Sequence, residues 1–252
     1  MRPVKIGVVA DVHQGPLDIR DHLKRFVRDM NSSFLPDLVV ELGDLLGYPA
    51  NEEELRKIDA EYAECRAPRY YVMGNHDLAS VDRSRFKKVL RIEYDWTSTT
   101  VDFLHIVFLD GAWGRWGPDR GAGPSGHIPE EELDWLRRDL KRCSEKQPII
   151  AFCHYPIRHP RVLTRNSELD NEDELMRVFE GHNLIATFGG HHHYGSYNEV
   201  GQVHHICLHS MGWWVPEKIT GSYAKIIITP EKLIVEGEGS QMDYRLSIKR
   251  AE

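Results

Sequence analysis

The sequence predicts a layered α/β fold, in which short buried strands alternate with amphipathic helices. Six short apolar runs rich in β-branched or aromatic residues each close with Gly, Asp, Asn or His, as expected of strands buried on both faces. Helical stretches lie between these runs, and strand-like runs without helices follow from about residue 195. The six runs are 4–11, 37–44, 69–77, 105–111, 148–154 and 184–191.

Four stretches between these runs are predicted to be helices. Residues 129–143 begin with Pro-Glu-Glu-Glu after a Gly-rich loop, and residues 171–181 begin with Asn-Glu-Asp-Glu, which are typical helix starts. Residues 51–64 are acidic and carry one apolar stripe, and residues 18–31 carry a second. That second stripe consists of Leu23, Phe26, Val27 and Met30.

The C-terminal part is expected to form a meander of strands. Its four runs are 204–211, 222–229, 232–239 and 243–248. The turn Thr-Pro-Glu-Lys between the second and third suits a hairpin. We expect one sheet built from βα units and a second sheet that receives the meander. We find no linker or repeat, so we expect a single domain over residues 1–252.

Composition excludes several classes of function. The net charge is −7 without a Lys/Arg cluster, which argues against an extended nucleic-acid surface, because such surfaces neutralise phosphates. No apolar segment is long enough to cross a bilayer, and the start lacks a secretory signal. The four cysteines are widely spaced and form no C-x-x-C pair, so neither a zinc knuckle nor a disulfide framework is indicated. We expect a cytoplasmic protein.

Polar residues close five of the predicted strands. In an open α/β sheet the carboxyl ends of strands converge on one crevice, where ligands bind. This set of oxygen and imidazole ligands without a thiolate suits Mn, Fe or Zn. In chain order the residues are Asp11 and His13, then Asp44, then Asn75, His76 and Asp77, then His154, and then His191, His192 and His193.

Each of these pieces alone has an ordinary explanation. Asp-x-His or Gly-Asp is often a turn or a helix cap, and a lone histidine such as His154 is more often a hydrogen-bonded core residue. The histidine triplet in GGHHHYG (189–195) is internal, so it is not a purification tag. The common setting at strand ends favours a metal site, because burying these acids together without a counter-charge is costly and a pair of ions removes that cost.

The set DVH, GDLL, GNHD, FCHYP and GHHH resembles the calcineurin-like metallophosphoesterases. The resemblance spans residues 11 to 193 and the strand pattern around them. It implies a four-layer αββα sandwich, in which two mixed β-sheets are flanked by helices. It also implies a two-metal site at one edge of the sandwich.

The resemblance further implies a role for each residue of the set. Asp44 would bridge the two ions, and His76 would face the phosphate instead of a metal. Asp77 would orient His76, or equally cap the segment that follows. The first ion would be held by Asp11, His13 and His193, and the second by Asn75, His154 and His191.

This arrangement would carry out hydrolysis at phosphorus. Two ions about 3.5–4 Å apart clamp an in-line displacement and lower the pKa of a bridging water, so that a hydroxide attacks. The ions and His76 would neutralise charge on the phosphoryl oxygens. If protonated, His76 would also hydrogen-bond or protonate the leaving oxygen.

Finer similarities point to a small, nucleotide-like substrate. The branch of the family that dephosphorylates proteins has a further Asp and an Arg soon after Gly-Asp, whereas this chain continues GDLLGYPAN. The C-terminal third is similar to manganese-dependent ADP-ribose/CDP-alcohol diphosphatases. The helix entry SGHIPEEELDWLRRDL is similar both to these and to cyclic-nucleotide phosphodiesterases. We therefore expect hydrolysis of small phosphodiesters or nucleotide pyrophosphates.

The Gly-rich loop 111–127 offers candidate substrate contacts. Its tryptophans could stack on a base and its arginines could contact a second phosphate, while the ordinary alternative is that the tryptophans pack the loop onto the sheet. The residues concerned are Trp113, Arg115, Trp116 and Arg120.

Other functions remain open at this point. A phosphomonoesterase or a nuclease could use the same site, although a nuclease should have a basic groove. A non-catalytic, protein-binding scaffold is the alternative from another class, as in the retromer subunit that shares the fold and has lost key site residues. Here every expected ligand and His76 are present, which favours hydrolysis.

The histidine triplet itself is predicted to divide into two ligands and a bystander. Glycines before it would let the backbone turn tightly, and alternate residues of a short extended turn face the same way. His191 and His193 would then point at the metals and His192 away from them.

Overall fold

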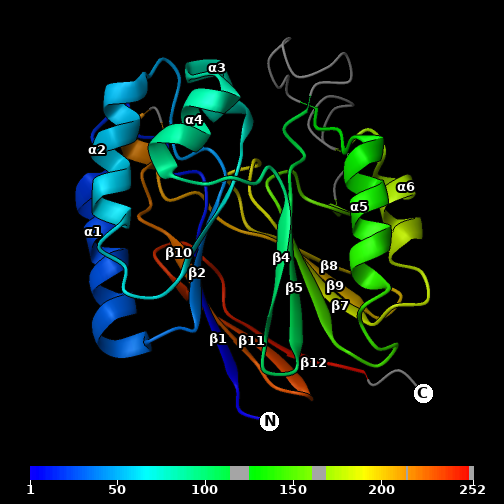
Figure 1. Cartoon of the computed structure of the whole chain (residues 1–252). Coiled ribbons are helices and arrows are strands. Elements are labelled where there is room, and N and C mark those ends of the chain that lie inside the picture. Colours follow the sequence, from blue (N-terminus) through cyan, green and yellow to red (C-terminus); the bar gives the residue numbers. More distant parts are fainter. Residues whose placement is uncertain (114–124, 161–168, 214, 250–252) are drawn as a thin grey trace.

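The computed structural model describes residues 1–113, 125–160, 169–213 and 215–249, and it contains two six-stranded sheets between layers of helices (Figure 1). In the first sheet the strand order is β12-β11-β10-β1-β2-β3. Strands β1, β2 and β3 are parallel, and β10 pairs with β1 in the antiparallel sense. The bounds are β1 (Val4–Val9), β2 (Leu38–Leu42), β3 (Arg69–Val72), β10 (Tyr223–Ile228), β11 (Lys232–Glu238) and β12 (Tyr244–Ser247).

The second sheet has the strand order β4-β5-β6-β7-β9-β8. Strands β5, β6, β7 and β9 are parallel, and the two edge strands are antiparallel to their neighbours. The sheets are therefore both mixed, which confirms the expected fold class. The bounds are β4 (Thr97–Val101), β5 (Leu104–Leu109), β6 (Ile149–Cys153), β7 (Leu184–Gly189), β8 (Ser196–Val200) and β9 (Val203–Cys207).

Helices cover the outer face of each sheet. In Figure 1, α1 and α2 lie on one side of the paired sheets, and α5 and α6 lie on the other. Each of the four helices expected from the sequence is present. Together with the shorter elements they are α1 (Arg20–Asp29), the π-helical turn η1 (Met30–Phe34), α2 (Glu52–Tyr62), α3 (Asn75–Ser80), α4 (Arg83–Leu90), α5 (Glu130–Leu140), α6 (Glu172–Val178) and the 3-10 turn η3 (Pro216–Lys218).

Along each central strand, successive side chains point alternately into two layers of the core, one between the sheets and one beneath the helices. In β1 the side chains of Val4, Ile6 and Val8 enter the layer between the sheets, whereas Val9 faces the helices. An aromatic stack spans the layer between the sheets, because Tyr70 of β3 lies 4.3 Å from Phe108 of β5, centroid to centroid. Buried strands of this kind are what continuous apolar runs predict.

The C-terminal meander corrects one expectation. We expected it to join a second sheet, apart from the βα units, but β10 pairs along β1 and so extends the sheet that contains the first βα units. The run 204–211 instead supplies β9 to the other sheet. The physical reason is that β1 pairs with β2 on one side only, so its other edge offers backbone groups that a strand can satisfy.

Besides the short turns η1 and η3, two strands and two helices were not predicted. The strands β4 and β8 are edge strands with sequences TSTTV and SYNEV, too polar to form an apolar run. The helices α3 and α4 are short, and α4 begins at a local signal, the carboxylate of Asp82 that accepts the N–H of Arg85.

No helix within the described ranges combines the length and the apolar run that a membrane crossing requires. The expectation of one domain over residues 1–252 stays a prediction.

Candidate metal centre

The five strand ends that the sequence singled out meet at one edge of the two sheets. The parallel strands β1, β2 and β3 supply the first three segments, and β6 and β7 supply the other two. Backbone hydrogen bonds join the segments. The N–H of Asp11 donates to Gly43 O at 3.0 Å, that of His13 to Asp44 O at 2.9 Å, and that of Gly190 to His154 O at 2.9 Å.

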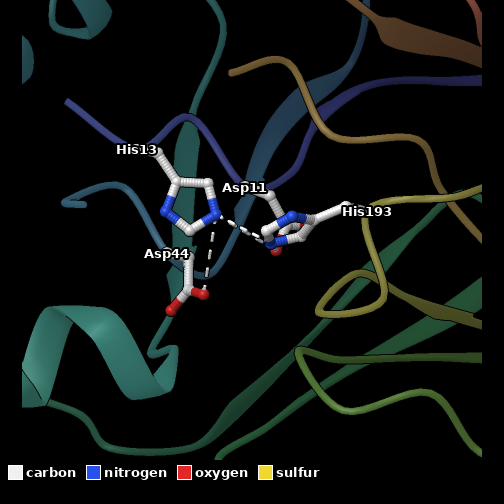
Figure 2. A group of neighbouring side chains, drawn as sticks. All are labelled: Asp11, His13, Asp44 and His193. Carbon is white, nitrogen blue, oxygen red and sulfur yellow. Dashed lines mark hydrogen bonds and ion pairs between the residues drawn. The ribbon is translucent and has the colours of Figure 1, made fainter. Parts of the chain in front are cut away.

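Two groups of candidate ligands result, and they share one residue. The ligand atoms of each group all lie within 4.8 Å of one another, and Asp44 belongs to both groups. Figure 2 shows the first group, with the imidazole of His13 pointing toward that of His193. The first group is Asp11, His13, Asp44 and His193, and the second is Asp44, His154 and His191.

The carboxylate of Asp44 lies between the two groups. Its Oδ1 accepts the backbone N–H of His76 at 2.8 Å. Its Oδ2 is buried and accepts no hydrogen bond from any described residue, while it lies 3.4 Å from Nε2 of His154 and 4.0 Å from Nε2 of His13. A buried carboxylate oxygen that faces two imidazole nitrogens at these distances fits a bound cation.

His154 is oriented by its second ring nitrogen. Nδ1 lies 2.9 Å from the carbonyl of Leu42, which can only accept, so Nδ1 carries the proton and donates. Nε2 is thereby directed into the site, where it lies 3.3 Å from Oδ1 of Asn75. Such a carbonyl behind a histidine is the usual device that fixes the ring of a metal ligand.

Electrostatics fit the same chemistry. Burial lowers the pKa of His13 to about 4 and that of His193 to about 2, so both rings are neutral at pH 7, as metal ligands must be. Burial, opposed by His154, raises the pKa of Asp11 to about 8. A cation bound beside Asp11 would lower the pKa of this carboxyl again and favour its ionised form.

Asp44, the residue that the two groups share, forms an ion pair with His154. Burial opposes ionisation of Asp44, but the imidazoles of His154 and His13 outweigh it and lower the pKa of this carboxyl. Burial likewise disfavours the imidazolium of His154, and the carboxylates of Asp44 and Asp11 outweigh it, raising its pKa to about 9. Asp44 is therefore the acid of the group that stays ionised.

The candidate ligands occupy an uncommon backbone conformation. Nine described residues other than glycine have a positive φ, and five of them are candidate ligands. Their φ values run from 50° to 67°, a left-handed region that costs side-chain-bearing residues energy. Strain of this kind persists where the surroundings over-determine it, and it gathers at functional sites. The five are Asp11, His13, Asp44, His191 and His193.

This conformation corrects the argument for the histidine triplet. We expected an extended turn at GHHH, but His191 and His193 have φ values of 67° and 61°. The two still enter the candidate groups, and His192 does not. Gly190, which precedes them, allows the backbone to lie close to Asp11, because a Cβ at this position would lie 2.5 Å from Oδ2 of Asp11. The N–H of His191 donates to the Asp11 carboxylate at 3.0 Å.

His192 is not directed into solvent. Its ring packs against that of His159, with centroids 4.5 Å apart, and burial lowers its pKa to about 4. His192 belongs to neither candidate ligand group, as the sequence predicted, although its ring centroid lies 5.5 Å from that of His191.

Asp77 has the second of the two roles that the sequence left open. Its Oδ2 accepts the N–H of Asp44 and of Gly74, both at 3.0 Å, and its Oδ1 accepts the N–H of Leu46 at 2.8 Å. The fully buried carboxylate therefore caps α3 and clamps the loop that carries Asp44. We assign it to holding this loop in place, not to orienting His76.

His76 lies at the border of the first group. Its ring meets that of His13 edge-on, with centroids 4.9 Å apart and planes at 90°. Its own backbone N–H is fixed on Asp44. The imidazole is thus beside the candidate ligands without belonging to either group.

The loop 111–127 is described only in part. The ring of Trp113 packs under the guanidinium of Arg83 at 4.2 Å, and its N–H donates to Asp110 at 2.9 Å. For Trp113 this is the packed alternative, with the indole against Arg83 and Asp110. The other expected contacts, Arg115, Trp116 and Arg120, lie outside the described residues.

Known proteins share both the sequence pattern and the architecture. A family model described as calcineurin-like phosphoesterase matches residues 4–195. A cAMP/cGMP dual specificity phosphodiesterase of Mycobacterium tuberculosis is 30% identical over 191 residues, which cover 72% of this chain and 57% of that protein. The chain thus spans little more than half the length of this relative.

A second relative and a solved structure match more of their own length. A manganese-dependent ADP-ribose/CDP-alcohol diphosphatase of Oryza sativa is 23% identical over 269 residues, covering 89% of this chain and 83% of that protein. The crystal structure of a dimetal phosphatase from Danio rerio superposes with a TM-score of 0.79 at 17% identity, covering 98% and 99% of the two chains. The structural likeness shows the shared fold.

Proposed function

The chain belongs to the calcineurin-like phosphoesterase family, and on that premise we propose that it hydrolyses small phosphodiesters or nucleotide pyrophosphates at a two-metal site. The observation that carries the proposal is the pair of candidate ligand groups that share Asp44. The names of the relatives support the substrate class, because one acts on cyclic nucleotides and the other on ADP-ribose or CDP-alcohols.

We assign the candidate ligands to two ions. Asp44 would be shared by both ions, because it belongs to both candidate groups. Bound Mn, Fe or Zn would supply a nucleophilic water at neutral pH and neutralise charge on the phosphoryl group. One ion would be held by Asp11, His13 and His193, and the other by Asn75, His154 and His191.

The chain's own residues would position and protonate the substrate. His76 lies beside the ligands without joining them, so its imidazole is placed to contact a phosphoryl oxygen and to give a proton to the leaving oxygen. Asp77 keeps the Asp44 loop in register with α3 through three backbone hydrogen bonds. The buried surroundings of Asp44 and His154 exclude bulk water and strengthen each of these interactions.

A panel of substrates assayed with added Mn(II) tests the proposal. The panel contains cyclic AMP, ADP-ribose, CDP-choline, glycerophosphocholine, bis(p-nitrophenyl) phosphate and the monoester p-nitrophenyl phosphate. We expect turnover of at least one diester or pyrophosphate, faster than that of the monoester, and its loss when a chelator is added. Absence of turnover with every divalent metal would refute hydrolysis, and a clear preference for the monoester would refute the substrate class. A location in the cytoplasm stays a prediction.

A further inference from the structure

The segment that follows β9 is fastened directly to the loop of candidate ligands. The N–H of Met211 donates to Ala10 O and that of Gly212 to Asp11 O, both at 3.0 Å. The approach is so close that a Cβ on Gly212 would lie 2.1 Å from Val12 O. The next residue, Trp213, therefore has a fixed position relative to the candidate metal centre.

Trp213 joins two other side chains at this position. Its ring meets that of His193 edge-on, with centroids 4.1 Å apart and planes at 86°. The ring of Tyr194 lies 5.7 Å away on another side, and Nζ of Lys218 lies 4.4 Å from the indole centroid. We call Tyr194, Trp213 and Lys218 the aromatic rim. It contacts the candidate ligand His193 through the ring of Trp213.

Tyr194 is an exposed aromatic residue that directly follows the candidate ligand His193 in the chain. Its relative exposure is 59%, although Trp213 supports one side of it. An aromatic ring held in water next to a candidate metal ligand marks a contact surface, because burying it elsewhere would be favourable. Trp113, by contrast, is committed to Arg83 and Asp110.

Lys218 adds charge to this surface. It is exposed, and among the described residues it forms no ion pair. The carboxylates of the centre are buried, so this ammonium is a positive charge at the border of an acidic site. A ligand with a flat ring and a phosphate matches the aromatic rim, because the ring can stack on Tyr194 and the phosphate can face the ammonium of Lys218.

We propose that the aromatic rim binds the nucleobase of the substrate, with the base stacked on Tyr194 and Lys218 facing its sugar-phosphate portion. The inference rests on the proposed function for the position of the reacting phosphate, which would lie at the centre beside His193. It narrows the substrate class to phosphoesters that carry a nucleobase. It also places base recognition on the turn after β7, which carries Tyr194, and on the segment after β9, which carries Trp213 and Lys218.

A comparison of two ligands that differ only by the base tests this inference. AMP and ribose 5-phosphate are titrated into the full chain with Mn(II), and their dissociation constants are measured by calorimetry. We expect AMP to bind about tenfold more tightly, the size typical of one base–aromatic stack. In Tyr194→Ala this difference should vanish, and in Tyr194→Phe, which keeps the ring, it should persist.

Tyr48 provides a matched control, because it is 60% exposed and follows the Asp44 loop instead of the His193 turn. Tyr48→Ala should keep the tenfold difference. Equal binding of AMP and ribose 5-phosphate to the wild type, or a difference that survives in Tyr194→Ala, would overturn the inference. Because the readout is binding, turnover of cyclic AMP, ADP-ribose or CDP-choline by the same samples shows separately whether the proposed function stands.

Discussion

Oδ2 of Asp44 lies 3.4 Å from Nε2 of His154, and both side chains are fully buried. Asp44 is also the residue that the two candidate ligand groups share. Its Oδ1 accepts the backbone N–H of His76 at 2.8 Å. Asp44 therefore places an ionised carboxylate between two sets of imidazoles.

The first prediction concerns Asp44→Asn. The amide keeps the shape of the side chain but removes the charge that both ions would share, so we expect metal to be lost from both groups and activity with it. Elemental analysis of the purified variant measures the metal content. Asp139→Asn is the control, because Asp139 is a buried acid that belongs to neither group. Wild-type metal content in Asp44→Asn would contradict the assignment.

The histidine triplet gives a second prediction. His191→Ala and His193→Ala should each lose metal, because each removes a ring from one candidate group. His192→Ala should keep metal and activity near the wild-type level, because the ring packs on His159 outside the groups. The three variants are compared by elemental analysis and by turnover of one substrate. Similar losses in all three would show that our division of the triplet is wrong.

A third prediction separates catalysis from metal binding at His76. In His76→Ala we expect the metal content to persist while kcat falls by about 10²–10⁴, the usual contribution of a proton donor. The reason is that the ring borders His13 without belonging to a ligand group. Metal analysis and steady-state kinetics on one sample decide the point. Loss of metal together with rate would place His76 among the ligands.

Asp77→Ala should act through stability, which is the fourth prediction. The change removes the acceptor of three buried backbone N–H groups, so we expect the free energy of unfolding to fall by about 3 kcal/mol or more. Ser80→Ala removes a single hydrogen bond from α3 to Gly47 O and should cost about 1 kcal/mol. Urea unfolding measures both. An Asp77→Ala variant as stable as Ser80→Ala would refute the clamp.

The fifth prediction uses the pH dependence of a carboxylate far from the centre. Burial opposes ionisation of Asp139, but hydrogen bonds from His105 at 2.7 Å and Ser98 at 2.9 Å outweigh it and lower its pKa. A lowered pKa adds stability above the unfolded-state value of about 3.9, and this stability is lost as the pH falls through the folded value.

Wild type should therefore exceed Asp139→Asn in stability by about 2 kcal/mol at neutral pH. The gap should close in acid, below the unfolded-state pKa. Urea unfolding of both proteins across this pH range measures it, and a gap that is the same at all pH values would contradict the shift.

The sequence predicted the strand ends well because their pattern is local. A buried strand is a continuous apolar run, and the polar residue that closes it, such as Asp44 or His154, is visible in the same stretch. Convergence then follows from the rule that the carboxyl ends of parallel strands share one edge. The division of His191 and His193 from His192 agrees with the candidate groups, although the left-handed backbone that produces it was not foreseen.

Long-range pairing was harder to predict. Strand β10 pairs with the edge of β1 whose backbone groups β2 leaves free. The hydrophobic periodicity of a sequence does not show which strand edge remains free. From the sequence, capping of α3 by Asp77 was one of two possible roles. The structure was needed to decide between them, because the three N–H groups that Asp77 accepts come from two loops that are separate in the sequence. The place of Trp213 beside His193 depends on the path of the chain after β9, which carries no motif.

The most direct test of the account is a crystal structure of the protein grown with Mn(II), with the ions located by anomalous scattering. We predict two peaks about 3.5–4 Å apart, one on each side of Oδ2 of Asp44. The first should be bounded by His13 and His193, and the second by His154 and His191. A single peak, or two peaks that do not share Asp44, would contradict the two-metal site.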